Sequence, residues 1–142
     1  HVLGMFLPAF ATGHLIQRFG TLPVMALGLL LNLACVAVAL GGLELERFVA
    51  ALLLLGVGWN FLFIGATTLL TSCYRPSERG KTQALNDFLV FGTTATSSFM
   101  AGYLQEHWGW FPLNTFSIAL LAIAVFAVFW LRMQDRRSAE LA

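Results

Sequence analysis

The stretch GHLIQRFGTLP, residues 13–23, recurs in outline as GYLQEHWGWFP, residues 102–112. Both copies have glycine at their first and eighth positions, leucine at the third and proline at the last. Glycine commonly follows the end of a helix, and proline is tolerated in the first turn of the next one. The repeated stretch therefore predicts that the chain makes the same sharp corner between two helices twice.

The sequence on either side of the corners is too apolar for a soluble domain. Hydrophobic residues make up 58% of the chain and charged residues 11%, whereas soluble domains have about 25% charged residues. A helix needs about 20 mostly apolar residues to cross a bilayer, and helices satisfy the backbone of such runs within lipid. The charge-free stretches are residues 1–17, 19–43, 48–74, 88–105 and 107–131.

These stretches predict an all-α polytopic membrane protein with five transmembrane helices embedded in a lipid bilayer. We expect the helices at about residues 2–17, 21–41, 47–72, 82–104 and 111–132. Together they would form one helical bundle over residues 1–132, followed by a tail of residues 133–142. The net charge of +1 gives no reason to expect a nucleic-acid partner.

Positive charges gather on one side of the expected bundle. If the helices cross in turn, the corner near Arg18, the loop of residues 75–81 and the C-terminal end from Arg132 onward share one side, which holds seven of the eight Lys and Arg. Only Arg47 lies on the other side. Because an excess of Lys and Arg marks the cytoplasmic face, we expect the C-terminus to lie in the cytoplasm.

The two corners are expected on opposite sides of the membrane, because three crossings separate them. Inverted three-helix units of this kind are typical of secondary transporters. Arg18 on the inner side and its counterpart His107 on the outer side agree with the positive-inside rule. The alternative is coincidence, since Gly, Leu and Phe are abundant in this chain.

Polar residues within the helix of residues 47–72 are candidates for contact with a solute, because polar groups in hydrocarbon usually face a partner or a water-filled cavity. Asn60 falls near the middle of this helix, and Thr67 lies on the same face. Trp59 beside it could stack on a flat or apolar solute. The alternative is that Asn60 bridges to a neighbouring helix, as buried amides often do.

The helix of residues 82–104 carries a polar face that includes Thr94 and Ser98. These hydroxyls either line a solute path or allow close helix packing. Asp87 is the one acid inside an expected crossing; it is either a proton-coupling group or an interfacial carboxylate paired with Arg79 or Lys81. The helices of residues 21–41 and 111–132 have few polar residues, and we expect them to face lipid.

No pattern in the sequence predicts an enzyme or a cofactor site. The three histidines and two cysteines have no metal-ligand spacing, and no phosphate loop or catalytic motif is present. The chain opens on His1 within an apolar run, and we expect it to be a piece of a longer protein. A small self-assembling membrane scaffold or assembly subunit is the competing hypothesis.

The sequence resembles one known family of transporters. GHLIQRFG, residues 13–20, is similar to the second copy of the loop signature G-x-x-x-D-R-x-G of the major facilitator superfamily. The run GVGWNFLFIGATTLLTSCYRPSERGKTQALNDF, residues 56–88, is similar to the tenth helix and the following cytoplasmic loop of bacterial members. The resemblance implies that the five helices correspond to helices eight to twelve of that family.

Carried over by position, Gly13, Arg18 and Gly20 are the loop elements that let the helices approach the other half of the protein at the cytoplasmic gate. Gln17 stands where the family has aspartate, so one charge of that contact is absent here. The loop that contains Glu78 and Arg79 would also help close this gate.

The resemblance also implies a secondary transporter that moves a small solute by alternating access, with a proton as the coupling ion and no cofactor. The missing N-terminal half of the same protein would complete the path. The central path would be lined by the helices of residues 2–17, 47–72 and 82–104, and the other two helices would be peripheral.

Overall fold

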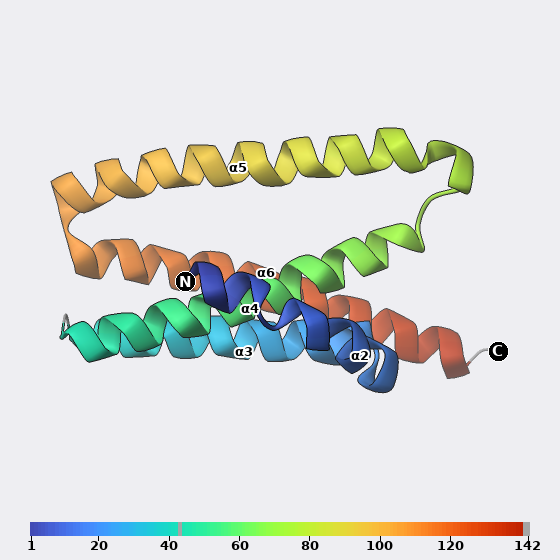
Figure 1. The fold of residues 1–142 in the computed structure, drawn as a ribbon, viewed down its shortest axis with the longest axis horizontal. Coiled ribbons are helices and arrows are strands. Elements are labelled where there is room, and N and C mark those ends of the chain that lie inside the picture. Colours follow the sequence, from blue (N-terminus) through green and yellow to red (C-terminus); the bar gives the residue numbers. More distant parts are fainter. Residues whose placement is uncertain (43, 141–142) are drawn as a thin grey trace.

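The computed structural model describes residues 1–42 and 44–140. It contains the helices α1 (Val2–Phe6), α2 (Ala9–Phe19), α3 (Thr21–Leu40), α4 (Leu45–Thr71), α5 (Arg79–Trp108) and α6 (Trp110–Glu140), and a short 3₁₀ helix, η1 (Pro76–Glu78). Within the described residues there are helices and no strands, which confirms the expected all-α class. Figure 1 shows the long helices lying side by side and joined by short connections.

Three of the helices are long and apolar enough to cross a membrane: α3, α4 and the Trp110–Gln134 part of α6. α5 is 30 residues long but is not among these three. It carries the hydroxyl-rich segment of residues 93–98, which lowers its hydropathy. The structure therefore supports three of the five expected spans by length and composition, and the crossings of α5 and of the first segment stay predictions.

The expected helix of residues 2–17 is divided in two at Leu7 and Pro8. Proline has no N–H to donate, and its ring collides with the preceding turn of a helix. α1 therefore ends at Phe6, and α2 begins anew at Ala9, with the N–H groups of Ala11 and Thr12 both bonded to the Pro8 carbonyl at 2.9 Å. The first segment is thus a discontinuous helix.

The two repeated corners have the same backbone conformation. Gly20 joins α2 to α3 with φ 87° and ψ 163°, and Gly109 joins α5 to α6 with φ 84° and ψ −174°. This region is essentially restricted to glycine, because a side chain there would be strained. Each glycine N–H also closes the preceding helix, at 2.8 Å from Ile16 O and 3.1 Å from Gln105 O.

The corners lie at opposite ends of the bundle in Figure 1, with the α2–α3 corner on the right and the α5–α6 corner on the left. An odd number of passes along the bundle separates them, as the order of the helices requires. This arrangement agrees with the expected inverted repeat.

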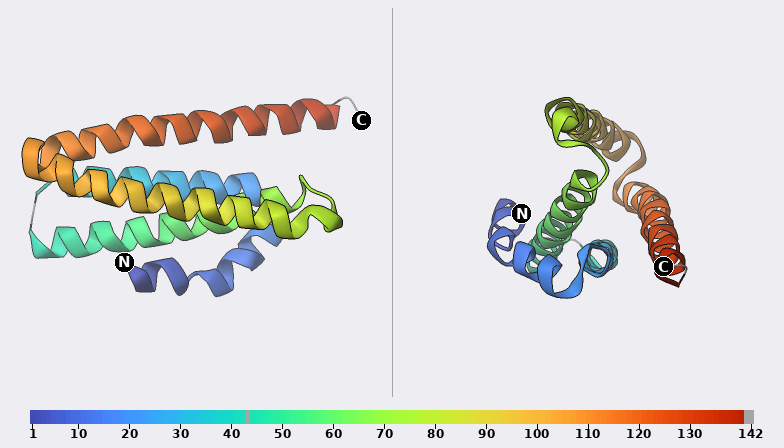
Figure 2. Two further views of the ribbon diagram at one scale, coloured as in Figure 1. Left: turned by 90° about the horizontal axis from the view of Figure 1, so that it is seen from above. Right: turned by 90° about the vertical axis from the view of Figure 1, so that its right-hand side faces the viewer.

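α3 and α4 form the most closely packed pair in the described bundle. Gly28 of α3 faces Gly58 of α4, and a Cβ added to either glycine would lie 2.8–2.9 Å from the other's carbonyl oxygen. Asn32 of α3 is buried against α4 at 6% exposure. The expectation that the helix of residues 21–41 faces lipid is therefore wrong for this face of α3. α6 also packs against α3, where Val128 joins a cluster with Met25 and Leu29, but it keeps most of its surface exposed. Figure 2 shows α5 at the edge of the bundle.

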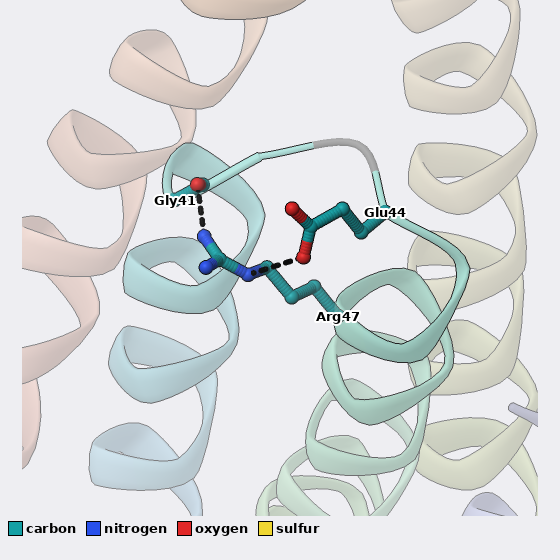
Figure 3. A network of polar contacts seen from close by, with 3 residues as sticks. All are labelled: Gly41, Glu44 and Arg47. Carbon is teal, nitrogen blue, oxygen red and sulfur yellow. Dashed lines mark hydrogen bonds and ion pairs between the residues drawn. The ribbon is translucent and has the colours of Figure 1, made fainter.

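Side-chain contacts tie one end of α3 to its neighbours. Arg47 donates to the Gly41 carbonyl and forms an ion pair with Glu44 at 3.1 Å, as Figure 3 shows. From α6, the Trp110 indole N–H donates to the carbonyl of Ala39 at 3.0 Å. These bonds satisfy carbonyls at the end of α3, where no further helical turn follows to donate N–H groups to them.

Candidate functional site

A groove lies between α4 and α5 and encloses a volume of about 770 Å³. We call it the α4–α5 groove. Its lining residues are Leu55, Trp59, Leu89, Val90, Thr93, Thr94, Ser97, Ser98 and Ala101. Three side chains that the sequence singled out as candidates, Trp59, Thr94 and Ser98, are therefore brought together on one surface.

The α4–α5 groove has two chemically different walls. The α4 side offers Trp59, whose ring stacks on Phe63 with centroids 4.6 Å apart and planes 9° apart, so that the indole is held in one orientation. The α5 side offers a row of hydroxyls. Such a groove can hold a molecule that is flat and apolar in one part and polar in another.

Two hydroxyls of this row are bonded to their own helix. Thr94 donates to Val90 O at 2.7 Å, and Ser98 donates to Thr94 O at 2.8 Å. Such bonds satisfy hydroxyl protons on a helix that has no buried residues in the described chain. The oxygen atoms of Thr94 and Ser98 can still accept a hydrogen bond from a solute.

A second hollow, of about 810 Å³, lies between α5 and α6 beside the Gly109 corner. Its walls include Leu104, Trp108 and Phe116, and its Thr115 hydroxyl donates to the Phe111 carbonyl. This hollow is slightly larger but offers little besides apolar contact. The α4–α5 groove is the better candidate site because it combines an aromatic face with several polar side chains.

Asn60 lies away from the groove, in the interface between α4 and the broken first helix. It is 2% exposed, and its Nδ2 donates to Met5 O at 2.6 Å. Thr12 Oγ1 lies 2.6 Å from Asn60 Oδ1 and 2.8 Å from Pro8 O, so its single proton is shared between these acceptors. The sequence left two roles open for Asn60, contact with a solute and a bridge to a neighbouring helix. These hydrogen bonds are those of a bridge between helices.

The bridge satisfies backbone that the Pro8 break exposes. Broken helices are tolerated in membranes where a neighbouring helix supplies the lost hydrogen bonds, and Asn60 does so for the Met5 carbonyl. Thr12, which is fully buried, was missed by sequence reasoning. The usable signal was Pro8 inside an apolar run, since a proline there leaves backbone groups that need partners.

The other candidates lie outside the groove lining. Thr67 is half-buried on α4. Asp87 is exposed, and its Oδ1 accepts from the Asn86 amide at 3.3 Å. Among the described side chains it forms no ion pair with Arg79 or Lys81, so the interfacial pairing considered from sequence is not present.

The residues of the loop signature lie at the end of the bundle where α2 meets α3. Gly13 is exposed, and a Cβ added there would meet nothing within 4 Å, so this face of α2 is open. The Arg18 guanidinium lies 5.4 Å from the ring centre of Phe19. The carboxylate of Glu78 accepts from the Arg75 N–H at 3.4 Å, and Arg79 is exposed at the start of α5.

In the described chain, no group of three acidic, His or Cys residues could hold a metal ion.

Long apolar helices, a discontinuous first segment and two glycine corners at opposite ends of the bundle are features of a polytopic membrane protein built from inverted repeats, an architecture that many secondary transporters share. The profile of the Major Facilitator Superfamily matches residues 1–141. The chain belongs to this family.

Its relatives are transporters by name. The riboflavin transporter RfnT of Brucella anthropi is 46% identical over 142 residues, which is 100% of this chain and 35% of the relative. Two proteins of Bacillus subtilis, named as the uncharacterized MFS-type transporters YddS and YdeG, are 31% and 32% identical over 96% and 93% of this chain. The chain spans about a third of the length of these relatives. No solved structure matches.

Proposed function

We propose that this chain is the C-terminal part of a secondary transporter that moves a small solute across the membrane by alternating access. The family match supports a transporter over an enzyme or a self-assembling scaffold. The missing N-terminal half would supply the opposite wall of the path, because the α4–α5 groove is open on one side and α5 has no buried residue in the described chain.

The solute that the groove suits best is riboflavin or a close analogue. Riboflavin joins a flat heteroaromatic ring to a chain of hydroxyls, and these two parts match the indole wall and the hydroxyl wall. The groove volume of about 770 Å³ lies within the usual range for small-molecule sites. The 46% identity to a riboflavin transporter is the second support. The juxtaposition of Trp59 with the hydroxyl row is the observation that carries the proposal.

The gate and the coupling group lie at one end of the bundle in this proposal. Figure 1 shows the α2–α3 corner and the connection from α4 to α5 at the same end. Arg18 and Arg79, with Gly13, Gly20 and Glu78 in the same loops, would help to close the path there. This end would face the cytoplasm of a bacterial inner membrane, as would the C-terminus, because it collects the positive charge.

Asp87 is the proposed carrier of the coupling proton. It is exposed and, among the described side chains, has an amide neighbour rather than a cation. The carboxyl group is therefore open to water and is held in no ion pair among the described side chains. Replacement by asparagine would remove uphill accumulation driven by a pH gradient and leave downhill exchange of the solute intact.

Uptake of labelled riboflavin tests the proposal. The full-length protein would be produced in cells that neither synthesise nor import riboflavin, and Trp59→Ala would be compared with Trp59→Phe. Loss of an aromatic stack lowers affinity by up to about tenfold, so Trp59→Ala should raise KM by that factor and Trp59→Phe by less. Trp130→Ala is the matched control, because Trp130 is exposed on α6 away from the groove.

The unaltered protein should take up riboflavin, and a hundredfold excess of unlabelled riboflavin should abolish uptake of the label. Absence of uptake above that of cells without the protein would reject riboflavin as the solute. Equal KM values for Trp59→Ala and Trp130→Ala would reject the α4–α5 groove as its binding site.

A further inference from the structure

The hydroxyls of residues 93–98 on α5 fall into two groups that the sequence does not distinguish. Thr94, Thr96 and Ser98 each donate their proton to the carbonyl four residues earlier, at 2.7–2.9 Å. Thr93 and Ser97 lie between them on the same helix. In the described part of the chain, these two hydroxyls have no hydrogen-bond partner.

The uncommitted hydroxyls share one place on α5. Both line the α4–α5 groove, and both also line an adjoining hollow of about 400 Å³ with Phe88 and Gly92. Residues four apart are neighbours on a helix, with Cβ atoms about 5–6 Å apart. Thr93 and Ser97 therefore present two adjacent free donors to the space beside Trp59.

We propose that Thr93 and Ser97 donate hydrogen bonds to the ring carbonyl oxygens of the solute, and so select for a flavin-type ring. This inference rests on the proposed function and assigns a role to residues that are not among the candidates that the sequence indicated. Thr94 and Ser98 then serve as acceptors, since their protons are already used.

The chemistry of the two halves of riboflavin separates the roles. Its ring carbonyls can only accept hydrogen bonds, so they need hydroxyls with a free proton. Its chain hydroxyls can donate as well as accept, so they can bond to any hydroxyl oxygen, including those of Thr94 and Ser98. Only Thr93 and Ser97 among the hydroxyls of the groove meet the requirement of the ring.

The free-energy cost of leaving a hydroxyl unpaired in lipid also indicates that Thr93 and Ser97 face water or a solute. A Thr or Ser that faces lipid satisfies its proton by bonding to its own helix, because hydrocarbon offers no acceptor. Thr93 and Ser97 do not do so although their neighbours do. Their side chains are thus in the state expected of groups that meet water or a solute.

The test uses two solutes and two matched pairs of variants in the full-length protein. Thr93→Val and Ser97→Ala remove the free donors, whereas Thr94→Val and Ser98→Ala remove hydroxyls whose protons are committed. Competition against labelled riboflavin is measured with riboflavin itself and with lumiflavin, which has the same ring but a methyl group in place of the hydroxyl chain.

Thr93→Val and Ser97→Ala should each raise the inhibition constant of both solutes by about tenfold, as expected for an unpaired polar group. Thr94→Val and Ser98→Ala should leave lumiflavin inhibition within about twofold of the unaltered protein. Thr93→Ser, which keeps the hydroxyl, should restore the original value. Amounts of protein in the membrane are measured for every variant, so that a folding defect is separated from a binding defect.

Two results would overturn the assignment. If Thr93→Val and Ser97→Ala raise the inhibition constant of riboflavin but not that of lumiflavin, the free hydroxyls bind the hydroxyl chain of the solute rather than its ring. If neither solute is affected while Trp59→Ala still raises the KM of riboflavin, the proposed function stands and this inference fails. Failure of the unaltered protein to take up riboflavin would instead reject the proposed function.

Discussion

Replacing Asn60 by alanine should destabilise the protein through one identifiable set of contacts. Asn60 donates to Met5 O and accepts from Thr12, each at 2.6 Å, and it is 2% exposed. A hydrogen bond between membrane helices contributes about 0.6 kcal/mol on average and up to about 1.7. Loss of both bonds therefore predicts a decrease in the free energy of unfolding of about 1–3 kcal/mol, apart from the effect of the smaller side chain.

Asn32→Ala is the matched control for this change. Asn32 is also buried, at 6% exposure, but its Oδ1 has no hydrogen-bond partner. The two substitutions remove the same atoms from buried positions in interfaces that α4 makes with its neighbours, so the difference between them measures the hydrogen bonds. Asn60→Ala should be less stable than Asn32→Ala by about 1–3 kcal/mol.

Unfolding of the full-length protein in mixed micelles, titrated with sodium dodecyl sulfate, gives the required free energies. Thr12→Val and the double variant complete a mutant cycle, and the coupling between Thr12 and Asn60 should be about 0.5–1.7 kcal/mol. Equal stability of Asn60→Ala and Asn32→Ala, together with simple additivity in the cycle, would refute the bridge across the Pro8 break.

Further predictions concern the corners and the close helix contacts, and all are read from the same titration. Gly20→Ala places a side chain at φ 87° and should cost about 1–3 kcal/mol, whereas Gly13→Ala, where a Cβ meets nothing within 4 Å, should be near neutral; equal effects would contradict the corner conformation. Gly58→Ala brings a Cβ to 2.8 Å from Gly28 O and should lower the free energy of unfolding by about 1–3 kcal/mol. Gly92→Ala, where a Cβ meets nothing within 4 Å, should not destabilise the protein. A neutral Gly58→Ala would disprove the close packing of α3 on α4. Arg47→Ala removes an exposed ion pair and should change stability by about 1 kcal/mol or less; a larger loss would show that the tie to Gly41 dominates.

The repeated corner could be predicted from sequence because its signals are local. Gly20 and Gly109 adopt a conformation that other residues avoid, so a glycine at the same position in both copies predicts the same backbone turn in both. The charge-free runs likewise predict membrane-spanning helices, because their length and apolar composition match the thickness of a bilayer. Thr94 and Ser98 could be identified as candidates because polar side chains in hydrocarbon usually face a partner or a water-filled cavity, and Trp59 because it lies beside the polar Asn60.

The parts that sequence reasoning missed depend on which helix meets which. Helical spacing shows that Asn60 lies on a polar face, but the choice between a solute and the Met5 carbonyl depends on the approach of α1 to α4. The helix of residues 21–41 was expected to face lipid because it has few polar residues, and the burial of Asn32 on it follows from contact with Gly58 of α4. Thr93 and Thr94 differ in whether the hydroxyl bonds to its own helix, which no sequence pattern encodes.

The most direct test of the α4–α5 groove as a solute path is the reaction of a cysteine placed inside it. In full-length protein with Cys35 and Cys73 replaced, Thr94→Cys would be treated with a water-soluble maleimide in membrane vesicles, with and without riboflavin. Ile123→Cys, at a residue 67% exposed on α6, is the lipid-facing control. We predict that Thr94→Cys reacts and that riboflavin slows its reaction, while Ile123→Cys stays unlabelled. Labelling of Thr94→Cys no faster than of Ile123→Cys, or labelling unaffected by saturating riboflavin, would contradict a solute path between α4 and α5.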